Sequence, residues 1–590
     1  MNKKLFYLIF GLLIILSPFV QSQTIDPDKY PSTDVKEWGQ LLWNLKLADQ
    51  DPADFTNYSK VDDQGVSACR YTIAFSAYFL SLEQYHKFPA WREAIQPAVD
   101  QLISRMLRKE VWGYWSHESM GITKFEPNMD RPYPQNNDPV SLGNIMYSGH
   151  LGMMINLYQM LYHDMKWDRP GSIVFEYDSA NRFVYDNNSL QEVMILQMLH
   201  NPIPGIECER NAVFPACNTH PMISWKLYDQ MHQTRYFEAA HMVFDPWFEK
   251  VFINSKTKDL ASFYLIKQGW AFSGWNPKYG NKMDAVMEGM VKKGVDFNSG
   301  GNDGWIGTFM HAWNPKLIDD LYPYLKKKHF KLNAGGSATM TKDVVAPDCY
   351  YGFFAALAAE TGDESAVKAL LKTVDSIYSP VWIDGTYHYP FMDKVPTVNL
   401  AAADGEKKPP ASTETTPPPT HMDQAAPQSV KADPQATGKT PEVKSSGLCC
   451  KSTQIMGHGD ACNMKSFPPH SDLADRLIAM ARALPAKGLY TLINRPFDDK
   501  HFSEPAITGV DLKQVILKRA IYDRVKKALV ISTVAKAGAG NASISIINLD
   551  PAKNYNPMLD GSRLPAITGQ KSFELTLDGG KSHEIQVVEK

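Results

Sequence analysis

Residues 71–80 read YTIAFSAYFL, a stretch that is apolar on nearly every side when it is wound into a helix. A helix of this kind has to be buried all round. Residues 91–111 carry apolar side chains at three-to-four spacing, which predicts an amphipathic helix. These side chains are Ile95, Val99, Leu102, Ile103 and Met106. The helical series continues in the segments 144–162, 221–231, 316–325 and 350–360.

These helical hairpins follow one another from about residue 32 to residue 371 without strand–helix–strand alternation. The pattern predicts a mainly α fold, an α/α toroid rather than an α/β sheet. At 590 residues, the chain is long enough for one large domain and smaller additions. With 44% hydrophobic and 21% charged residues, its composition is that of a globular protein. The net charge of −3 gives no basic field for nucleic acid, and seven Cys are too few for a disulfide scaffold.

The N-terminal residues have the pattern of a signal peptide. Residues 1–4 include Lys3 and Lys4, and residues 5–20 are apolar, so we expect residues 1–22 to be removed before Gln23. The alternative is a retained N-terminal membrane anchor. No other stretch approaches the roughly 20 uncharged residues of a membrane span. We therefore expect an exported protein, periplasmic or secreted, without stable membrane insertion after cleavage.

A Pro-rich segment at residues 402–470 interrupts the helical domain, which we place at residues 23–401. The segment has few large apolar side chains and cannot bury a core, so we expect a disordered insert. Its end carries a Cys cluster that resembles metal ligands, but vicinal cysteines there favour disulfide staples. The cluster consists of Cys449, Cys450, His458, Asp460 and Cys462. The helical period returns at residues 471–495, which we expect to be the last helix of the barrel.

Beyond Pro505 the hydrophobic period changes to two, which predicts strands. A turn at residues 578–580 indicates that the last two strands form a hairpin. We expect an antiparallel β-sandwich domain at residues 505–590. The predicted strands are residues 528–534, 543–547, 573–577 and 584–588.

Familiar catalytic motifs are absent, and the most suggestive local feature is a loop with two thiols. Cys208 and Cys217 lie nine residues apart. The same loop carries carboxylate, basic and aromatic side chains, namely Glu207, Glu209, Arg210, Phe214 and His220. In an exported protein the two thiols can form a structural disulfide, and this alternative stays open. A zinc site would need closer ligand pairs and more imidazole groups.

Two other polar features have an ordinary structural interpretation when taken alone. His150 lies on an apolar helical face, where a histidine is more often a hydrogen-bonded core residue than a catalyst. An acidic run with one tyrosine precedes the first buried helix and has the composition of a solvated loop. The residues of this run are Asp49, Asp51, Asp54 and Tyr58.

Taken together, several short segments in one order resemble linalool dehydratase/isomerase and its relatives. The resemblance spans about residues 40–390 and resumes at residues 471–495. The matching segments are RYTIAFSAY at 70–78, VWGYW at 111–115, NIMYSGHL at 144–151, NPIPGIECE at 201–209, CN at 217–218, WKLYD at 225–229, WIG at 305–307 and AW at 312–313.

The resemblance implies an (α,α)6 barrel and a cofactor-free enzyme. Such an enzyme removes or adds water at an allylic tertiary alcohol and isomerises the alkenol. The catalytic residues that the family motifs imply are Cys208, Cys217, His150 and Glu209, with Asp49 or Asp51 and Tyr58 at positions where the spacing differs. The expected substrate-binding residues are Met146, Tyr71, Phe214, Phe309 and Trp305. Phe309 departs from the family pattern, which has Tyr at this place in a Trp-Ile-x-x-Tyr run.

The chemistry needs an acid for the leaving hydroxyl, a base for a carbon-bound proton and a pocket without bulk water. The expected partner is a small apolar alcohol or alkene, and the ring assembly of the compact family member makes a homo-oligomer a further expectation. One alternative is a glycosidase or polysaccharide lyase on an (α,α)6 barrel. Its carboxylates would come from Glu118, Glu126 and Asp138. The other alternative is a non-catalytic exported ligand-binding protein.

Overall fold

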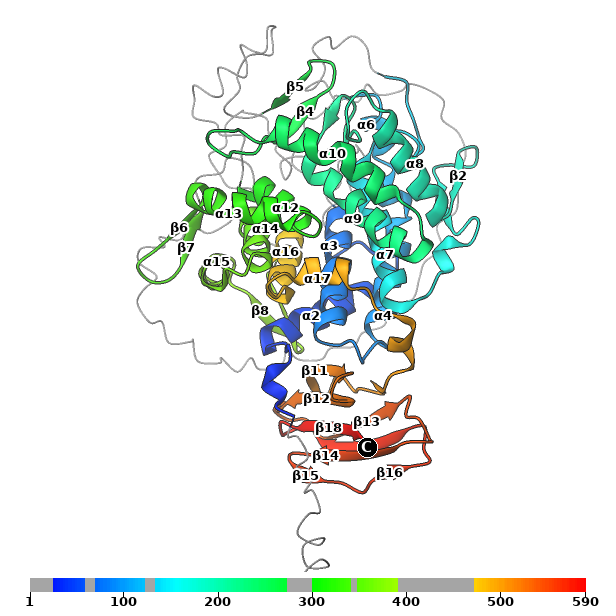
Figure 1. Ribbon diagram of the computed structural model, residues 1–590, viewed down its shortest axis with the longest axis vertical. Helices are drawn as coiled ribbons and strands as arrows, with labels where there is room; N and C mark the ends of the chain where they lie inside the picture. Colours follow the sequence, from blue (N-terminus) through cyan, green and yellow to red (C-terminus); the bar gives the residue numbers. More distant parts are fainter. Residues whose placement is uncertain (1–24, 59–68, 122–132, 273–299, 341–346, 391–471) are drawn as a thin grey trace, which may run out of the picture.

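The computed structural model describes residues 25–58, 69–121, 133–272, 300–340, 347–390 and 472–590. A large helical part lies above a smaller part made of strands (Figure 1). The predicted signal peptide, the Pro-rich insert and the Cys449–Cys462 cluster lie outside the described residues. Within the described ranges, none of the helices combines the length and the apolar character that crossing a membrane would require.

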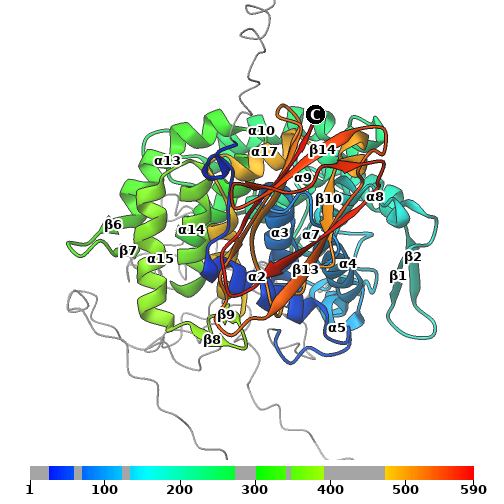
Figure 2. The same cartoon turned by 90° about the horizontal axis from the view of Figure 1, so that it is seen from below.

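Six helices contact one another in a closed cycle, in which each touches the next and the last touches the first. Figure 2 views this part through the sheets, which cover one end of α3 and α2 (Val35–Ala48). Every residue of α7 is buried, as its mostly apolar sequence requires. The six helices are α3 (Cys69–His86), α7 (Ile145–Tyr162), α9 (Pro215–His232), α12 (Gly300–Met310), α14 (Pro347–Glu360) and α16 (Asp472–Ala483).

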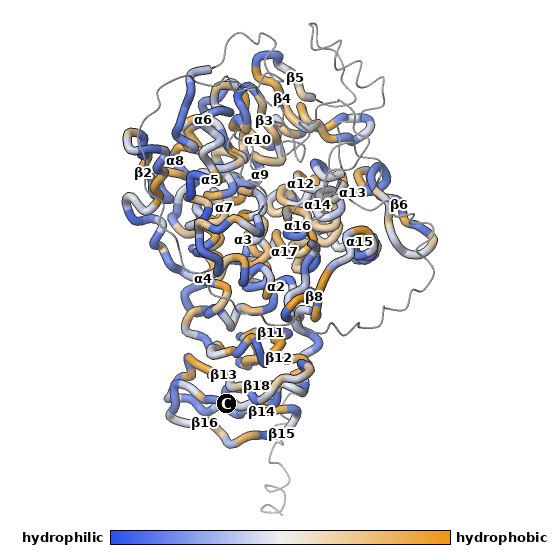
Figure 3. Tube along the Cα trace, turned by 180° about the vertical axis from the view of Figure 1, so that it is seen from behind, coloured by the Kyte–Doolittle hydropathy of each residue, from blue (hydrophilic) through white to orange (hydrophobic). Residues whose placement is uncertain are grey.

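A second set of helices packs on the outside of this cycle. The amphipathic α4 (Ile95–Met106) lies against α3 and α7, and all five of its predicted apolar side chains are buried. Other outer helices pack mainly on one helix of the cycle: α8 (Asn187–His200) on α7, α10 (Tyr236–Phe252) on α9, α13 (Pro315–His329) on α12 and α15 (Glu364–Tyr378) on α14. Hydrophobic residues follow the central helices, and hydrophilic residues follow many of the outer segments (Figure 3).

The helical part also contains short strands that the sequence did not predict. They pair antiparallel in four small sheets between helices. Runs of two to four residues are too short for a clear two-residue period, which is why the pattern misses them. The strands are β1 (Ile173–Glu176), β2 (Arg182–Tyr185), β3 (Ala212–Val213), β4 (Phe263–Leu265), β5 (Trp270–Phe272), β6 (Phe330–Leu332), β7 (Ala338–Met340), β8 (Val381–Ile383) and β9 (Thr386–His388).

The C-terminal strands form two antiparallel sheets. One has the order β10-β13-β17, and the other has the order β11-β12-β18-β14-β15 with β16 paired to β14. All four predicted strands are present. The bounds are β10 (Ala506–Thr508), β11 (Ile516–Asp523), β12 (Ala528–Val534), β13 (Asn541–Ile547), β14 (Asn554–Leu559), β15 (Ser562–Arg563), β16 (Ile567–Thr568), β17 (Phe573–Asp578) and β18 (Glu584–Glu589).

The predicted hairpin between the last two strands is wrong. β17 pairs with β13, whereas β18 pairs with β12 and β14 in the other sheet. Leu575 and Leu577 of β17 and Ile585 and Val587 of β18 belong to the same buried core. The two strands therefore contribute to one core from different sheets, and the turn after Asp578 carries the chain from one sheet to the other.

The sheets are joined to the helical part by main-chain hydrogen bonds. Ala520 of β11 donates to the Lys87 carbonyl at 2.9 Å and accepts from the Ala90 amide at 3.0 Å. The Ile507 amide donates to the Ala90 carbonyl at 2.8 Å. Ordered contacts of this kind fix the sheets against the segment that follows α3.

Candidate active site

Two imidazole rings meet where α7 and α9 approach each other closely. A Cβ atom on Gly149 would lie 2.9 Å from Cδ of Pro221, and one on Gly152 would lie 2.9 Å from Oγ of Ser224. Only glycine allows this approach, because any larger residue would push the helices apart. The rings of His150 and His220 consequently lie with their centroids 3.8 Å apart, and both are buried.

The hydrogen bonds of the two rings differ. The Trp305 indole N–H donates to Nε2 of His220 at 2.8 Å, so the proton of this neutral ring is on Nδ1, which lies 3.5 Å from Sδ of Met153. The Tyr78 hydroxyl and Nδ1 of His150 share a hydrogen bond of 2.8 Å. Nε2 of His150 has no hydrogen-bond partner among the described residues. His150 is thus the ring with a nitrogen available for other chemistry.

Burial lowers the pKa of both imidazoles well below the usual value. For His150, the neighbouring His220 and Arg70 lower the pKa further. For His220, burial is the cause. Both rings are therefore neutral near pH 7, and a neutral imidazole can accept a proton.

The two thiols lie at the start of α9 and in the loop before it. Cys208 donates its amide hydrogen to the Ala212 carbonyl at 2.9 Å, and Cys217 lies in the first turn of α9, which begins at Pro215. The Asn218 side chain holds the loop, since it accepts from the Ile206 amide at 2.8 Å and donates to the Ile206 carbonyl at 3.0 Å. Both cysteines are buried free thiols, so no disulfide joins them.

Burial raises the pKa of the Cys208 thiol well above its usual value. A hydrogen bond with Cys217 and the charge of Glu209 raise the pKa further, while the Arg70 guanidinium opposes the shift. The thiol is therefore protonated near pH 7 and can donate a proton. Burial likewise raises the pKa of the Tyr71 hydroxyl, and its neighbours include both thiols.

Arg70 brings a fixed positive charge to this group of side chains. Its guanidinium lies between the rings of Tyr71 and Tyr114, 4.4 and 4.3 Å from their centroids. It donates to the Tyr71 hydroxyl and faces Sδ of Met146, both at 3.2 Å. Burial lowers the pKa of Arg70, but the neighbouring Tyr114, Tyr71 and Glu209 raise it above the usual value. A buried cation held by aromatic faces favours a negative charge nearby.

Aromatic rings enclose the imidazoles. Tyr71 lies 5.4 Å from His150, and Phe309 lies 4.5 Å from His220, measured between centroids. Trp305 stacks on Phe353 at 4.7 Å. We refer to the whole group as the thiol–imidazole cluster: Arg70, Tyr71, Phe75, Tyr78, Met146, His150, Cys208, Glu209, Cys217, His220, Trp305 and Phe309.

Three other expected site residues have the following surroundings. Asp49 is exposed at the end of α2. The Tyr58 hydroxyl donates to the Leu47 carbonyl at 3.0 Å, and the Arg105 guanidinium lies 4.6 Å from its ring centroid. Phe214 packs on Phe263 with 5.0 Å between centroids.

Four residues of the cluster were not among the expected site residues: Arg70, Phe75, Tyr78 and His220. Two of them could have been found from spacing. His220 lies three residues after Cys217, and Tyr78 lies seven residues after Tyr71, so each pair shares one face of a helix. Arg70 is a charged residue at the start of an almost wholly apolar helix, and a charged residue at a buried position indicates a specific partner or a functional role.

Of the three carboxylates considered for a glycosidase, the structure describes Asp138 and Glu118. Asp138 accepts from the Tyr185 hydroxyl at 2.6 Å and from the Val140 amide at 2.9 Å, as a loop-forming aspartate does. Glu118 is buried next to His117. Glu126 lies outside the described residues. In the same described ranges, no three His, Cys, Asp or Glu side chains are grouped as metal ligands would be.

Comparison with known proteins gives a family and several distant structural likenesses. The family model described as linalool dehydratase/isomerase matches residues 70–296 and 278–395. This match confirms the resemblance seen in the sequence, and it includes every residue of the thiol–imidazole cluster but neither Asp49 nor Tyr58.

Two solved structures are similar to part of the chain. One is an inactive variant of an α-1,6-mannanase of family GH76 from a Salegentibacter species, in complex with α-1,6-mannotriose. It is 11% identical over 58% of this chain and 88% of that chain, with a TM-score of 0.31. The other is a GH76 α-mannanase from Bacteroides thetaiotaomicron, 12% identical over 61% of this chain and 87% of that chain, with a TM-score of 0.34. Scores of this size indicate only a loose overall likeness.

Proposed function

Because the chain belongs to the linalool dehydratase/isomerase family, we propose that it is a hydro-lyase and isomerase acting on an allylic or tertiary alkenol. The proposal includes an (α,α)6 barrel for the cycle of helices, a β-sandwich for the C-terminal sheets and no cofactor. One observation carries it: two buried free thiols and a buried neutral imidazole, His150, neighbour the same side chain, Tyr71. That combination can transfer protons away from water.

The protonation states favour particular roles. Cys208, protonated near pH 7, donates its proton to the leaving hydroxyl of the alkenol, and the C–O bond breaks to release water. Nε2 of His150 takes a proton from the neighbouring carbon, and the C–H electron pair becomes the new C=C bond. The imidazolium then returns the proton to the thiolate. The alkenol has become an alkene and water, and the enzyme is unchanged.

The surroundings support charge separation in this sequence. Arg70 stabilises the Cys208 thiolate, because it lowers the pKa of that thiol. The rings of Tyr71 and Trp305 provide aromatic faces for a positively charged carbon. All these side chains are buried, so water cannot add to the cation before the proton is lost.

The proposal extends to export into the periplasm or the medium, on the basis of residues 1–22, and to assembly as a homo-oligomer. An exported enzyme with reduced cysteines needs them protected from oxidation. Burial of Cys208 and Cys217 provides this protection, because oxidation requires an accessible thiolate.

The test is incubation of the mature protein with a panel of terpene alcohols and alkenes, with volatile products analysed by gas chromatography. We expect dehydration or isomerisation of at least one alkenol, and its loss in Cys208→Ala and in Cys217→Ala. Alkylation under denaturing conditions without reductant, followed by peptide mass spectrometry, should label both cysteines. A protein that is inactive on the whole panel, or that keeps full activity in both variants, would refute the proposal.

A further inference from the structure

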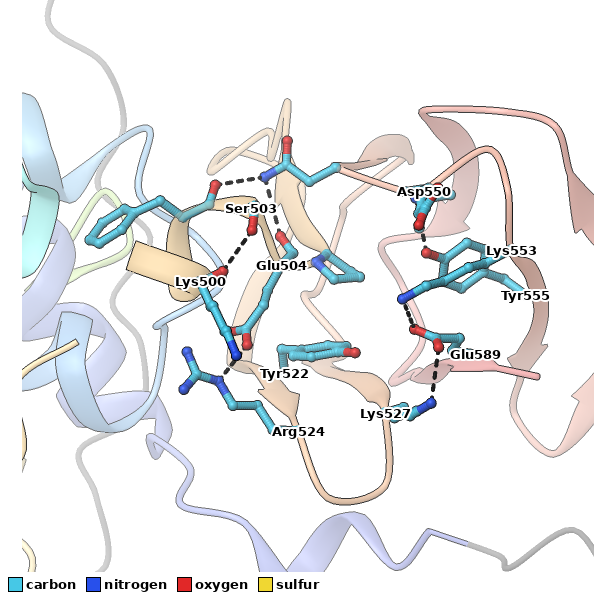
Figure 4. Close-up of a pocket in the computed structure, with 14 residues that line it drawn as sticks. Lys500, Ser503, Glu504, Tyr522, Arg524, Lys527, Asp550, Lys553, Tyr555 and Glu589 are labelled. Carbon is cyan, nitrogen blue, oxygen red and sulfur yellow. Dashed lines mark hydrogen bonds and ion pairs between the residues drawn. The ribbon is translucent and has the colours of Figure 1, made fainter. Parts of the chain in front are cut away.

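A cleft lies in the C-terminal part of the chain, apart from the thiol–imidazole cluster. Its volume is about 930 Å³, within the usual range of ligand sites. The segment before β10, the β11–β12 turn, the β13–β14 connection and the end of β18 form its walls (Figure 4).

Two groups of ion-paired side chains face each other across this cleft. On one side, Arg524 pairs with Asp498 through Nη1 at 2.9 Å and with Glu504 through Nε. On the other side, Glu589 accepts from Lys553 at 2.9 Å and from Lys527 at 3.2 Å. Glu504 therefore pairs with Arg524, and Glu589 pairs with two lysines.

The exposure of the charged groups leaves hydrogen-bonding capacity toward the cleft. The Glu589 side chain is 7% exposed, whereas the side chains of Lys553 and Lys527 are 44% and 61% exposed. Each ammonium group has three N–H donors and uses one for Glu589. Asn548 donates from Nδ2 to the carbonyls of Phe502 and Glu504, which leaves its amide oxygen as an acceptor.

An aromatic ring lies between the two charged groups. Figure 4 shows Tyr522 with Glu504 and Arg524 on one side and Glu589 on the other. Burial raises the pKa of Tyr522, and the charges of Glu589 and Glu504 raise it further, so both carboxylates lie near it. The side chain is partly exposed, and its hydroxyl has no hydrogen-bond partner among the described residues.

These features favour a neutral polyhydroxyl ligand over a free anion or a free cation. A free anion would compete with Glu504 and Glu589 for the same cations, and a free cation would compete with the lysines and Arg524 for the carboxylates. A neutral polyhydroxyl ligand competes with neither, because each hydroxyl can donate to a carboxylate and accept from an ammonium group. The C–H face of a sugar ring can also cover the Tyr522 ring.

We propose that this cleft binds a neutral oligosaccharide, through Tyr522 and the ion pairs of Glu589 and Glu504. The site is separate from the thiol–imidazole cluster and does not depend on the alkenol chemistry. It gives the C-terminal sheets a function in holding the protein on a glycan.

The test is affinity electrophoresis of the full chain in gels with dextran, soluble xylan or galactomannan, followed by calorimetry with oligosaccharides of the best polymer. Polygalacturonate serves as the acidic arm. Tyr522→Ala should weaken binding at least about tenfold, equivalent to 1.4 kcal/mol. Tyr522→Phe keeps the ring and should bind within about threefold of the parent. The matched control is Tyr324→Ala on α13, a half-exposed tyrosine in the helical part, which should bind as the parent does.

Several outcomes would overturn the proposal. Retention by none of the three neutral polymers is one, and binding that survives Tyr522→Ala is another. Stronger retention by polygalacturonate, lost at high salt, would show that the cleft recognises anions instead. Thermal unfolding of each variant verifies its fold. If Tyr522→Ala unfolds, Lys553→Ala keeps the test decisive, because it removes hydrogen-bond donors from the cleft and should also weaken binding. Alkenol turnover in Tyr522→Ala should equal that of the parent, which separates this test from that of the proposed function.

Discussion

The thiol–imidazole cluster and the C-terminal cleft differ in the charge state of their ionisable side chains. In the cluster, burial lowers the pKa of His150 and raises that of Cys208, so both are neutral near pH 7. In the cleft, Glu589 stays charged between Lys527 and Lys553, whose side chains reach the solvent. The lysines that pair with Glu589 keep contact with water, which lowers the cost of these charges.

The comparison shows what each place is suited to do. Neutral groups that can exchange one proton are suited to moving it onto and off an apolar molecule. In ion pairs at a surface, the two groups compensate each other's charge, and their remaining donors and acceptors are suited to hydrogen bonding with a polar, uncharged ligand. Under the two proposals, chemistry takes place in the helical part and glycan binding on the sheets.

The largest expected effect comes from replacing the His150 imidazole of the cluster. His150→Gln should lower kcat for the alkenol by about 10³-fold, since a positioned general base contributes roughly 10²–10⁴-fold. The matched control is His86→Gln, a change at a partly buried histidine of the helical part. Gas chromatography of the products measures both. Equal activity in the two variants would mean that the cluster has no special role.

The acid stability of the helical part should depend on its buried neutral histidines. Burial lowers the pKa of His86 to about 4, and its Nε2 lies 3.0 Å from the Gly488 carbonyl. Above pH 6.5 its contribution to folding is complete. As the pH falls from 6.5 to 4, the unfolded chain binds a proton that the folded chain does not, so stability is lost.

For His86 alone this loss amounts to about 3 kcal/mol at pH 4. Glutamine can still donate to the Gly488 carbonyl but does not titrate. We therefore expect urea unfolding of His86→Gln to show a drop in the free energy of unfolding between pH 7.5 and pH 4 that is smaller by about this amount. An identical drop in the parent and the variant would argue against a neutral, partly buried His86.

Phe309→Tyr tests how strictly the cluster excludes unpaired polar groups. The new hydroxyl would enter a buried site beside His220, whose ring lies 4.5 Å from that of Phe309. Without a partner, the hydroxyl should cost about 1–2 kcal/mol of stability and change the preference among alkenols. Thermal unfolding and the substrate panel measure the two effects. An unchanged melting temperature would indicate that the hydroxyl has found a partner.

The smallest effect is expected in the cleft. Lys553→Ala removes one of the two cations at Glu589, whose other partner, Lys527, remains. Because the Lys553 side chain is 44% exposed and Lys527 still pairs with Glu589, we expect a loss of less than about 1 kcal/mol, and less still at high salt. Urea unfolding at two salt concentrations measures it. A loss as large as that of Phe309→Tyr would mean that the cleft is not the solvated site we describe.

Sequence patterns predicted most of the elements that depend on local periodicity. The strand at residues 528–534 has the predicted bounds, and α4 buries the side chains that its spacing indicated. The helix predicted at 221–231 begins six residues earlier, at Pro215, because proline is favourable in the first turn of a helix. Pro221, the predicted first residue, lies inside the helix. The short strands between helices have no period long enough to detect.

The candidate site was predicted in part. Cys208, Cys217 and His150 came from family motifs, since nothing in their spacing brings them together. His220 joins them only because Gly149 and Gly152 let α9 approach α7. The cleft could not be predicted at all, because Glu504, Tyr522, Asn548 and Glu589 come from four separate segments.

The amino-acid sequence by itself determined several of the long helices, four of the C-terminal strands and the family to which the chain belongs, since these follow from neighbours within a few residues and from short motifs. Only the tertiary structure decided that β17 and β18 lie in different sheets and that Cys208 and Cys217 remain thiols. It also decided which ionisable groups lose contact with water. Pairing and burial depend on residues far apart in the chain, and a local pattern carries no record of them.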